Sequence, residues 1–253
     1  MTAIDDCVTA VKETFGAIFA HIDDWRTRIE ALVVTGNGRV TAGEVDSLAE
    51  SLVVAGLEIP GAIVIGAGFV AAPKFLTDSD WHLAWWLGKS NTFGVGAAEP
   101  GIRRLETIED ESDESFRDYT NLEWWRVPAR TGAPHITGPY VDYLCTDDYT
   151  LTLTVPVIID DAVVGVVGAD LYVEDVERML LPALRSMPGT VTLVNRSARV
   201  VVSTNPHRAT GSILRLDGLL DSLRGEVRTP SSALPSVVPV PWGGTSLALV
   251  VEQ

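Results

Sequence analysis

Acidic and aromatic side chains gather in the middle of the chain, beside its most strand-like segments. Near Asp142 and Asp170, a span of 25 positions holds five aromatic residues, Tyr119, Trp124, Trp125, Tyr140 and Tyr143. Trp and Tyr rings can form walls around a cation, and a carboxylate can neutralise its charge. These residue types indicate a site for a small cationic ligand. The alternative is an ordinary core packed by tryptophan, with the tyrosines at its edge.

Asp170 carries the clearest indication of a special role. It ends the run VVGVVGAD, whose other residues suit full burial, and a buried carboxylate needs a partner. In the stretch HITGPYVDYLCTDDYTLTLTVPV (135–157), Tyr140 is the residue expected to face a ligand, with Asp142 behind it as support. Tyr140 and Asp170 are therefore predicted to meet in one pocket.

Other kinds of site find little support in the spacing of the residues. The four histidines lie in separate elements and no C-x-x-C pair exists, which argues against a zinc site. GAGFVA (66–71) matches a dinucleotide fingerprint by letter, but Pro73 and further β character follow where a helix is required. Its glycines are better explained by a bulge or a tight turn. No cofactor, metal ion or catalytic residue is expected.

Composition limits the partners and the location. The formal net charge of −15 disfavours binding to nucleic acids, which requires clustered Lys and Arg. No long uninterrupted apolar segment exists, so no membrane span is expected, and the N-terminus lacks the pattern of a secretory signal. Cys7 and Cys145 are too few and too far apart for a disulfide scaffold. These features predict a cytoplasmic protein.

The elements that must position the candidate residues begin with two helices. Apolar residues spaced three and four apart predict a long helix over 3–34, which TGNG ends. A second helix is predicted to start after Thr41 and to end near Gly56. Thr41 and Glu44 resemble a capping box, which is offset by one residue if Ala42 begins the helix.

β-Rich segments follow the helices. Strands are predicted in AIVIGAGFVAA, WHLAWWLGK and GIRRLET, then a short helix that Pro128 stops, then a strand at 139–144. The strongest strand signals lie at 149–159 and 162–173, joined by a short hairpin turn. A helix with an interior proline, Pro182, comes next, and this proline predicts a kink or an early end.

The last segment predicts a smaller β–β–α–β–β unit, with hairpin turns at Arg196–Ala198 and Gly243–Gly244. Because the repeated βαβ pattern of a parallel sheet is missing, the predicted fold is α+β, with a five- or six-strand antiparallel meander. The predicted domains are a helical segment at 1–58, a sheet domain at 59–186 and the smaller unit at 187–253.

The order of these motifs resembles the Cache (PAS-like) family of ligand-sensing domains, in particular its double-Cache members. The matching landmarks are Trp124–Trp125 for the family's Trp-Tyr pair, GPYVD (138–142), YTLTLTVPV (149–157) and VVGVVGADLYV (163–173). The resemblance covers most of residues 1–210 and is most specific in its central block. It implies a PAS-like antiparallel sheet behind a long N-terminal helix, with a second PAS-like module after it.

In amino-acid-binding members of that family, an Arg holds the ligand carboxylate, while a Tyr and an Asp hold the ammonium. Carried over by position, the resemblance implies that Trp124, Trp125, Tyr140 and Asp170 belong to a ligand site. The full predicted ligand site adds three nearby residues and consists of Tyr119, Trp124, Trp125, Arg126, Tyr140, Asp142 and Asp170. Leu122 stands where the family has Arg, and Trp125 lacks the hydroxyl of the family's Tyr. Without the bidentate Arg, the preference shifts from an amino acid toward an amine. Arg126 or Arg117 could restore acid binding.

The function that the resemblance implies is a small-molecule sensor that binds an amine, an amino acid or a similar metabolite. With no output domain, it is expected to signal through a separate protein, or by dimerising through the N-terminal helix. The alternative is that this helix packs on its own sheet, as amphipathic helices commonly do. The alternative function is an enzyme acting on a small amine or carboxylic acid, with Asp170, Asp142 or His135 as acid or base.

Overall fold

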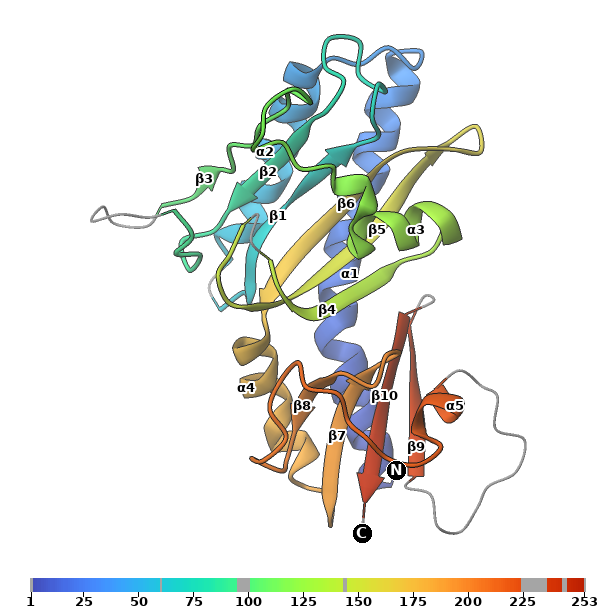
Figure 1. Ribbon diagram of the computed structural model, residues 1–253. Coiled ribbons are helices and arrows are strands. Elements are labelled where there is room, and N and C mark those ends of the chain that lie inside the picture. Colours follow the sequence, from blue (N-terminus) through green and yellow to red (C-terminus); the bar gives the residue numbers. More distant parts are fainter. Residues whose placement is uncertain are drawn as a thin grey trace.

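The computed structural model describes residues 2–59, 61–94, 101–142, 145–223, 236–242 and 245–252 (Figure 1). Tyr143 and the turn predicted at Gly243–Gly244 lie outside these residues. Two antiparallel sheets lie one above the other, and the first helix runs behind both of them (Figure 1). The α+β fold class predicted from the sequence is confirmed.

Two helices begin the fold, as predicted. α1 spans Ala3–Thr35 and α2 spans Ala42–Leu57. Each starts with a capping box, in which the N-cap threonine and the third helical residue satisfy one another's backbone N–H groups. In α2 these residues are Thr41 and Glu44. The box is regular rather than offset by one residue, because Thr41 is itself the N-cap.

The larger sheet has six strands in the described part of the chain, in the order β3-β2-β1-β6-β5-β4, and all neighbours are antiparallel. The bounds are Val64–Ala71 (β1), Leu83–Leu87 (β2), Arg103–Arg104 (β3), His135–Val141 (β4), Tyr149–Ile159 (β5) and Ala162–Tyr172 (β6). A turn with positive φ at Asp160 and Asp161 joins β5 to β6.

The predicted meander is wrong in its order, because β1 pairs with β6 and not only with its sequence neighbour β2. After β3 the chain crosses the sheet to its far edge and returns to the centre through β4, β5 and β6 (Figure 1). β1 and β6 are buried along nearly their whole length, which suits central strands. β4 also begins at His135, earlier than predicted, because His135 pairs with Thr154 of β5.

The two faces of the larger sheet differ, because side chains alternate along each strand. On β5, Leu151, Leu153 and Val155 belong to the hydrophobic cluster that includes α1. Thr152 and Thr154 lie between them in the sequence and therefore face the other side. The alternation of Thr with Leu and Val thus gives the sheet two different faces. One face packs against α1, and the opposite face, which carries the threonines, can hold a ligand site.

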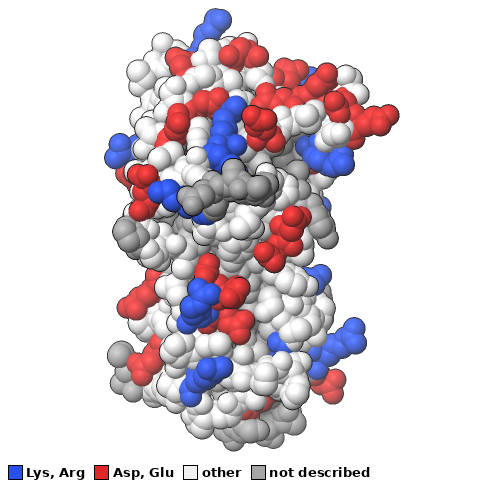
Figure 2. Space-filling model, turned by 90° about the vertical axis from the view of Figure 1, so that its left-hand side faces the viewer, with Lys and Arg blue, Asp and Glu red and all other residues white. Residues whose placement is uncertain are grey.

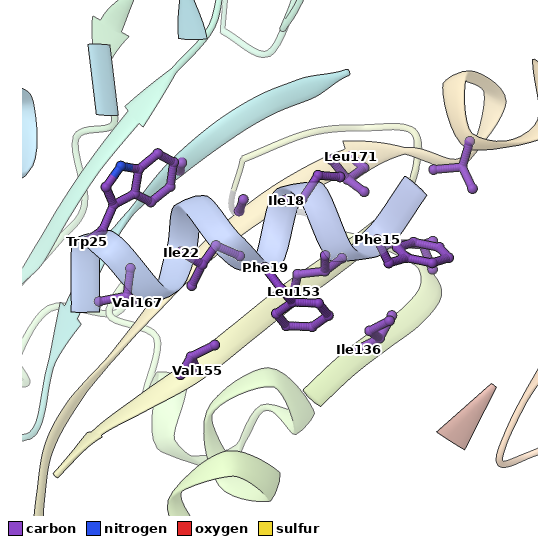
Figure 3. Packing of buried hydrophobic residues seen from close by; sticks show 14 of the residues in the cluster. Phe15, Ile18, Phe19, Ile22, Trp25, Ile136, Leu153, Val155, Val167 and Leu171 are labelled. Atoms are coloured by element: carbon purple, nitrogen blue, oxygen red, sulfur yellow. The ribbon is translucent and has the colours of Figure 1, made fainter. Parts of the chain in front are cut away.

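α1 covers the first of these faces. Its side chains lie over those of the sheet, where Figure 3 labels Phe15, Ile18, Phe19, Ile22 and Trp25 near Ile136, Leu153, Val155, Val167 and Leu171. The same cluster continues into Leu193 and Leu249 of the smaller sheet. The apolar stripe of α1 is therefore buried within one chain, as in the second alternative above. A homodimer through α1 stays a prediction.

The smaller sheet follows α4 (Val173–Leu184), which ends two residues after Pro182. Its order is β8-β7-β10-β9, with bounds Thr190–Asn195 (β7), Val200–Ser203 (β8), Ser236–Trp242 (β9) and Thr245–Glu252 (β10), and α5 spans Leu219–Leu223. The Asn195 side chain donates to the Gly138 carbonyl of β4 at 2.6 Å. The two sheets are therefore joined by a direct hydrogen bond.

Pro128 does not stop α3, which spans Glu123–Thr131 and ends at Gly132 with φ of 66°. A proline inside a helix leaves the carbonyl four residues earlier without its donor. Here that carbonyl belongs to Trp124, and the Thr154 hydroxyl donates to it at 2.9 Å. The helix continues because β5 replaces the missing hydrogen bond, and the same bond fixes α3 on the sheet.

None of the described helices is long and apolar enough to cross a membrane. On the face in Figure 2, Lys and Arg side chains are dispersed among acidic ones and form no continuous basic patch. This is the surface that a net charge of −15 leads one to expect.

Candidate ligand-binding site

Asp142, Cys145 and Asp170 form a buried cluster on the face of the larger sheet opposite to α1. One oxygen or sulfur atom of each residue lies within 4.8 Å of those of the other two. Asp170, on β6, is 1% exposed, and Asp142, just after β4, is 7% exposed. The fold thus brings together the two carboxylates selected from the sequence, and adds a thiol that was not selected.

Two hydroxyl groups connect these carboxylates. Tyr140 Oη lies 2.8 Å from both Asp142 Oδ2 and Thr152 Oγ1, and Thr152 Oγ1 lies 2.7 Å from Asp170 Oδ1. The three hydrogen bonds need three protons, whereas the two hydroxyls supply two. One proton on either carboxyl group completes the chain, and its position sets the direction of all three bonds. The geometry is that of two carboxyl groups that share one proton.

The electrostatics agree with this proton count. Burial, and then the charge of Asp142, raise the pKa of Asp170 from 3.8 to about 7. Burial also raises the pKa of the Tyr140 phenol and of the Cys145 thiol well above their ordinary values. Cys145 Sγ lies 3.1 Å from Asp170 and 3.3 Å from Asp142. It is therefore a neutral thiol that donates to one carboxylate at a time.

The cluster lies at one side of a small cavity of about 20 Å³. Its other walls are apolar, and the described lining residues are Val70, Leu83, Trp85, Leu105, Trp124, Asp142, Cys145, Thr152 and Asp170. No Lys, Arg or His is among them. A cavity of this size has room for about one water molecule. The site is thus a small acidic cavity with aromatic walls.

Trp85 is the unexpected member of this lining. It lies on β2, opposite Gly68 of β1, which in turn pairs with Gly168 of β6. A Cβ at Gly168 would lie 3.4 Å from Cη2 of the indole, and a Cβ at Gly66 would lie 3.0 Å from its Nε1. Gly66 of GAGFVA and Gly168 of β6 therefore leave the space that this ring occupies. The bulge predicted for the glycines of GAGFVA is present as a register shift between Val64 and Gly66.

A metal ion is the other ligand that two carboxylates and a thiol could hold. Zinc takes four protein ligands in structural sites and binds cysteine as the thiolate. The described residues of the cluster supply three such groups, and the thiol is protonated. The hydroxyls of Tyr140 and Thr152 also occupy one oxygen of each carboxylate. The carboxylate oxygens of Asp142 and Asp170 accept hydrogen bonds. The cluster therefore suits a ligand that donates hydrogen bonds better than it suits a metal ion.

The other predicted site residues divide into two groups. Trp124 lines the cavity. Tyr140 is not in the described lining, but its hydroxyl is hydrogen-bonded to Asp142, which is. Tyr119 and Trp125 pack against one another with ring centroids 5.3 Å apart, outside the described lining, and Tyr119 Oη donates to the Ala71 carbonyl at 2.7 Å. The Arg126 side chain is exposed on α3. Contact of these last residues with a ligand stays a prediction.

Sequence reasoning did not select Trp85, Cys145 or Thr152. Thr152 had a signal, because it lies on the polar side of the TLTLTV alternation and next to Asp170 across the β5–β6 pair. Trp85 lies in a strand that was predicted, but its face follows only from the pairing of β2 with β1. For Cys145 no local pattern indicated a role.

Residues 98–178 match the family model described as methyl-accepting chemotaxis protein-like, first PDC sensor domain. No curated protein sequence matches the chain. The matched segment includes α3, β4, β5 and β6, and so it holds both carboxylates of the site.

Solved structures of chemoreceptor domains share the fold over nearly the whole chain. The ligand-binding domain of Pseudomonas fluorescens chemoreceptor CtaA with L-valine is 13% identical, with a TM-score of 0.58, and the match covers 98% of this chain and 93% of that one. The sensory domain of Campylobacter jejuni Tlp3 with isoleucine is 12% identical, with a TM-score of 0.57 and coverage of 98% and 88%.

The ligand-binding domain of Pseudomonas aeruginosa PctC with GABA is 13% identical, with a TM-score of 0.51 and coverage of 97% and 96%. At these identities the likeness concerns the fold. These matches give no support to the alternative of an enzyme, and the cytoplasmic location stays a prediction. The chain has the fold of chemoreceptor ligand-binding domains, and its central segment is similar to the PDC, Cache-like, type of sensor domain.

Proposed function

We propose that the chain is a sensor module that binds a small amine beside Asp170 and signals through a separate protein. The observation that carries the proposal is the buried pair of Asp142 and Asp170, with no Lys, Arg or His in the described lining of their cavity. Buried carboxylates are costly unless a cation or a proton neutralises them. A primary ammonium brings one positive charge and three donors, so it can replace the shared proton and bond to both carboxylates.

An amine fits this site better than an amino acid does, because a ligand carboxylate would find no cationic partner. Leu122 occupies the position where the family has Arg, and its side chain points partly to solvent, at 36% exposure. The side chain of Arg126 is exposed, and Arg117 is exposed and donates to backbone carbonyls of its own loop. Neither arginine lines the cavity as described.

The solved relatives support an ammonium as one feature that their ligands share. They include complexes with L-valine, L-alanine and GABA, and each of these molecules carries both an ammonium group and a carboxylate. The spacing between ammonium and carboxylate differs between L-valine and GABA. For this chain, we keep the ammonium as the recognised group and leave out the carboxylate, because no Lys, Arg or His is in the described lining of the cavity.

We also propose a double-Cache arrangement, with a helical segment at 1–58, the ligand-binding domain at 59–186 and a second PAS-like subdomain at 187–253. Two contacts support a route between the sheets. α1 packs on both of them, and Asn195 of β7 donates to Gly138, two residues before the ligand-side Tyr140. A ligand that moves β4 would therefore change a hydrogen bond to the smaller sheet.

Thermal unfolding with added small molecules tests the proposed function. The probes are ethylamine, 2-aminoethanol, L-valine, GABA and acetate, each added to wild type, Asp170→Asn and the exposed control Asp147→Asn. A ligand at 100 times its dissociation constant adds about 2.7 kcal/mol to the free energy of unfolding. We expect amines to raise the melting temperature of wild type and Asp147→Asn, and to leave Asp170→Asn unchanged.

Two outcomes would contradict the proposal. Stabilisation by acetate but not by amines would show that the pocket takes anions. An equal response of wild type and Asp170→Asn to the amines would show that the ligand binds elsewhere, because the asparagine lacks the charge that an ammonium requires.

A further inference from the structure

The indole nitrogen of Trp85 is a buried donor without a hydrogen-bond partner among the described residues. The residue is 6% exposed and lines the same cavity as Asp142 and Asp170. Buried donors in proteins are nearly always paired, and an exception calls for an explanation. The explanation we develop is that this N–H is part of the ligand site, and it rests on the amine-binding function proposed above.

The fold places this donor close to the carboxylates. Trp85 Nε1 lies 3.0 Å from the point where a Cβ would stand on Gly66, and Gly66 pairs directly with Asp170 across β1 and β6. Paired positions in antiparallel strands lie side by side on one face of the sheet. The N–H therefore lies above the position beside Asp170, in a place that only a glycine leaves open.

An ammonium alone cannot pair with this group, because it has three donors and no acceptor. A metal ion cannot pair with it either. An N–H donor needs a lone pair, so a ligand that satisfies the whole site carries an acceptor close to its cationic nitrogen. Asp142 and Asp170 already make the cavity acidic, and no basic residue is in its described lining. A carboxylate as the acceptor would be repelled, so the acceptor is neutral.

We propose that the ligand is a small amine with a neutral hydrogen-bond acceptor, such as an amino alcohol or an amino amide. Its ammonium binds between Asp142 and Asp170, and its hydroxyl or carbonyl oxygen accepts the N–H of Trp85. Trp85 is then the residue that determines specificity among amines, while the two aspartates provide the selectivity for a cation. Because the cavity has room for about one water molecule, its walls must move apart to admit even a ligand of a few heavy atoms, which restricts the site to the smallest amines.

Two matched pairs of probes test this by calorimetric titration at neutral pH. 2-Aminoethanol and propylamine differ by a hydroxyl in place of a methyl group, and glycinamide and glycine differ by an amide in place of a carboxylate. We expect wild type to bind 2-aminoethanol about tenfold more tightly than propylamine, as one buried hydrogen bond would give. We also expect it to bind glycinamide more tightly than glycine.

Removal of the N–H alone completes the test. In Trp85→Phe the two amines should bind with equal affinity, because the preference for 2-aminoethanol is lost. If that variant is unfolded by circular dichroism, replacement of Trp85 by benzothienylalanine keeps the bicyclic ring and removes only the donor. The control is Trp81→Phe, whose indole donates to Glu111 away from the cavity and whose preference should stay that of wild type.

The outcomes separate this inference from the function on which it rests. If propylamine binds wild type as tightly as 2-aminoethanol does, or if removal of the donor leaves the preference intact, the role of Trp85 is refuted while amine binding stands. If glycine binds more tightly than glycinamide, the neutral acceptor is refuted. If none of the amines binds, the proposed function fails, and this inference fails with it.

Discussion

Replacement of Asp170 by asparagine removes a carboxyl group that the folded chain holds in its protonated form at mildly acidic pH. Asparagine has the same shape, and its amide can keep the hydrogen bond to Thr152 Oγ1 in either direction, because Oδ1 accepts and Nδ2 donates. The substitution therefore isolates the cost of burying the charge. Asp170→Asn is expected to be more stable than wild type at pH 8 and similar to it at pH 4.

The direction follows from the raised pKa. Below pH 3.8 the group is protonated in the folded and the unfolded chain, so its protonation contributes nothing to the pH dependence. Above 3.8 the unfolded chain ionises Asp170 while the folded chain keeps the proton up to about 7, and stability falls as the pH rises through this window. The difference between the two pKa values of Asp170 corresponds to a loss of about 4 kcal/mol in the free energy of unfolding, at about 1.4 kcal/mol for each pH unit.

Urea denaturation between pH 4 and pH 8, followed by tryptophan fluorescence, measures this difference. The wild type should lose stability relative to Asp170→Asn between pH 4 and pH 7, and the difference should be constant above that range. Asp147→Asn, an exposed site with the same change of charge, serves as the control and should follow wild type. Parallel curves for wild type and Asp170→Asn would refute the burial of a protonated carboxyl group.

Three further predictions concern ligand binding and the packing of the sheet. Binding of 2-aminoethanol at pH 6 should release up to about one proton, because the ammonium replaces the proton that the carboxyl pair shares. Calorimetric titration in buffers of different ionisation enthalpy measures the number of protons released, and a binding heat that is the same in all buffers would contradict the prediction. Gly168→Ala should lower the free energy of unfolding in urea by about 1–3 kcal/mol, since its Cβ would lie 2.8 Å from the Leu153 carbonyl oxygen. The control is Gly43→Ala, at a position of α2 with open space, which should not lower the free energy of unfolding. Thr154→Val should lower the free energy of unfolding, measured by urea denaturation, by about 1–3 kcal/mol, because the buried Trp124 carbonyl loses its donor. An unchanged free energy of unfolding would show that Pro128 leaves no carbonyl in need of a partner.

Local patterns decided the elements of this fold. The apolar spacing over 3–34 gave the helix Ala3–Thr35 almost to the residue, because it encodes one continuous buried stripe. The hairpin of β5 and β6 was equally accessible, because its strands are adjacent and the turn residues Asp160 and Asp161 are short acidic residues, a type that tolerates positive φ. Asp170 was selected for a local reason as well, as the one charge in an apolar run.

The pairing of strands far apart in the sequence decided which residues meet at the candidate site. Alternation shows which residues of a strand share a face, but it does not show which strands are neighbours or what covers that face. The pairing of β1 with β6 places Gly66 beside Asp170, and the pairing of β2 with β1 lays Trp85 over that glycine. Pro128 likewise predicted the end of a helix, until Thr154 of β5 supplied the missing donor.

The candidate site shows the same division. From the chain alone, an acidic and aromatic pocket around Asp170 could be expected, because a buried carboxylate needs a partner wherever it lies. Its proton sharing with Asp142 through Tyr140 and Thr152, and the unpaired N–H of Trp85, arise from atoms on four different strands or their ends. Hydrogen bonds depend on distances of a few ångströms, and only the folded sheet brings these groups that close.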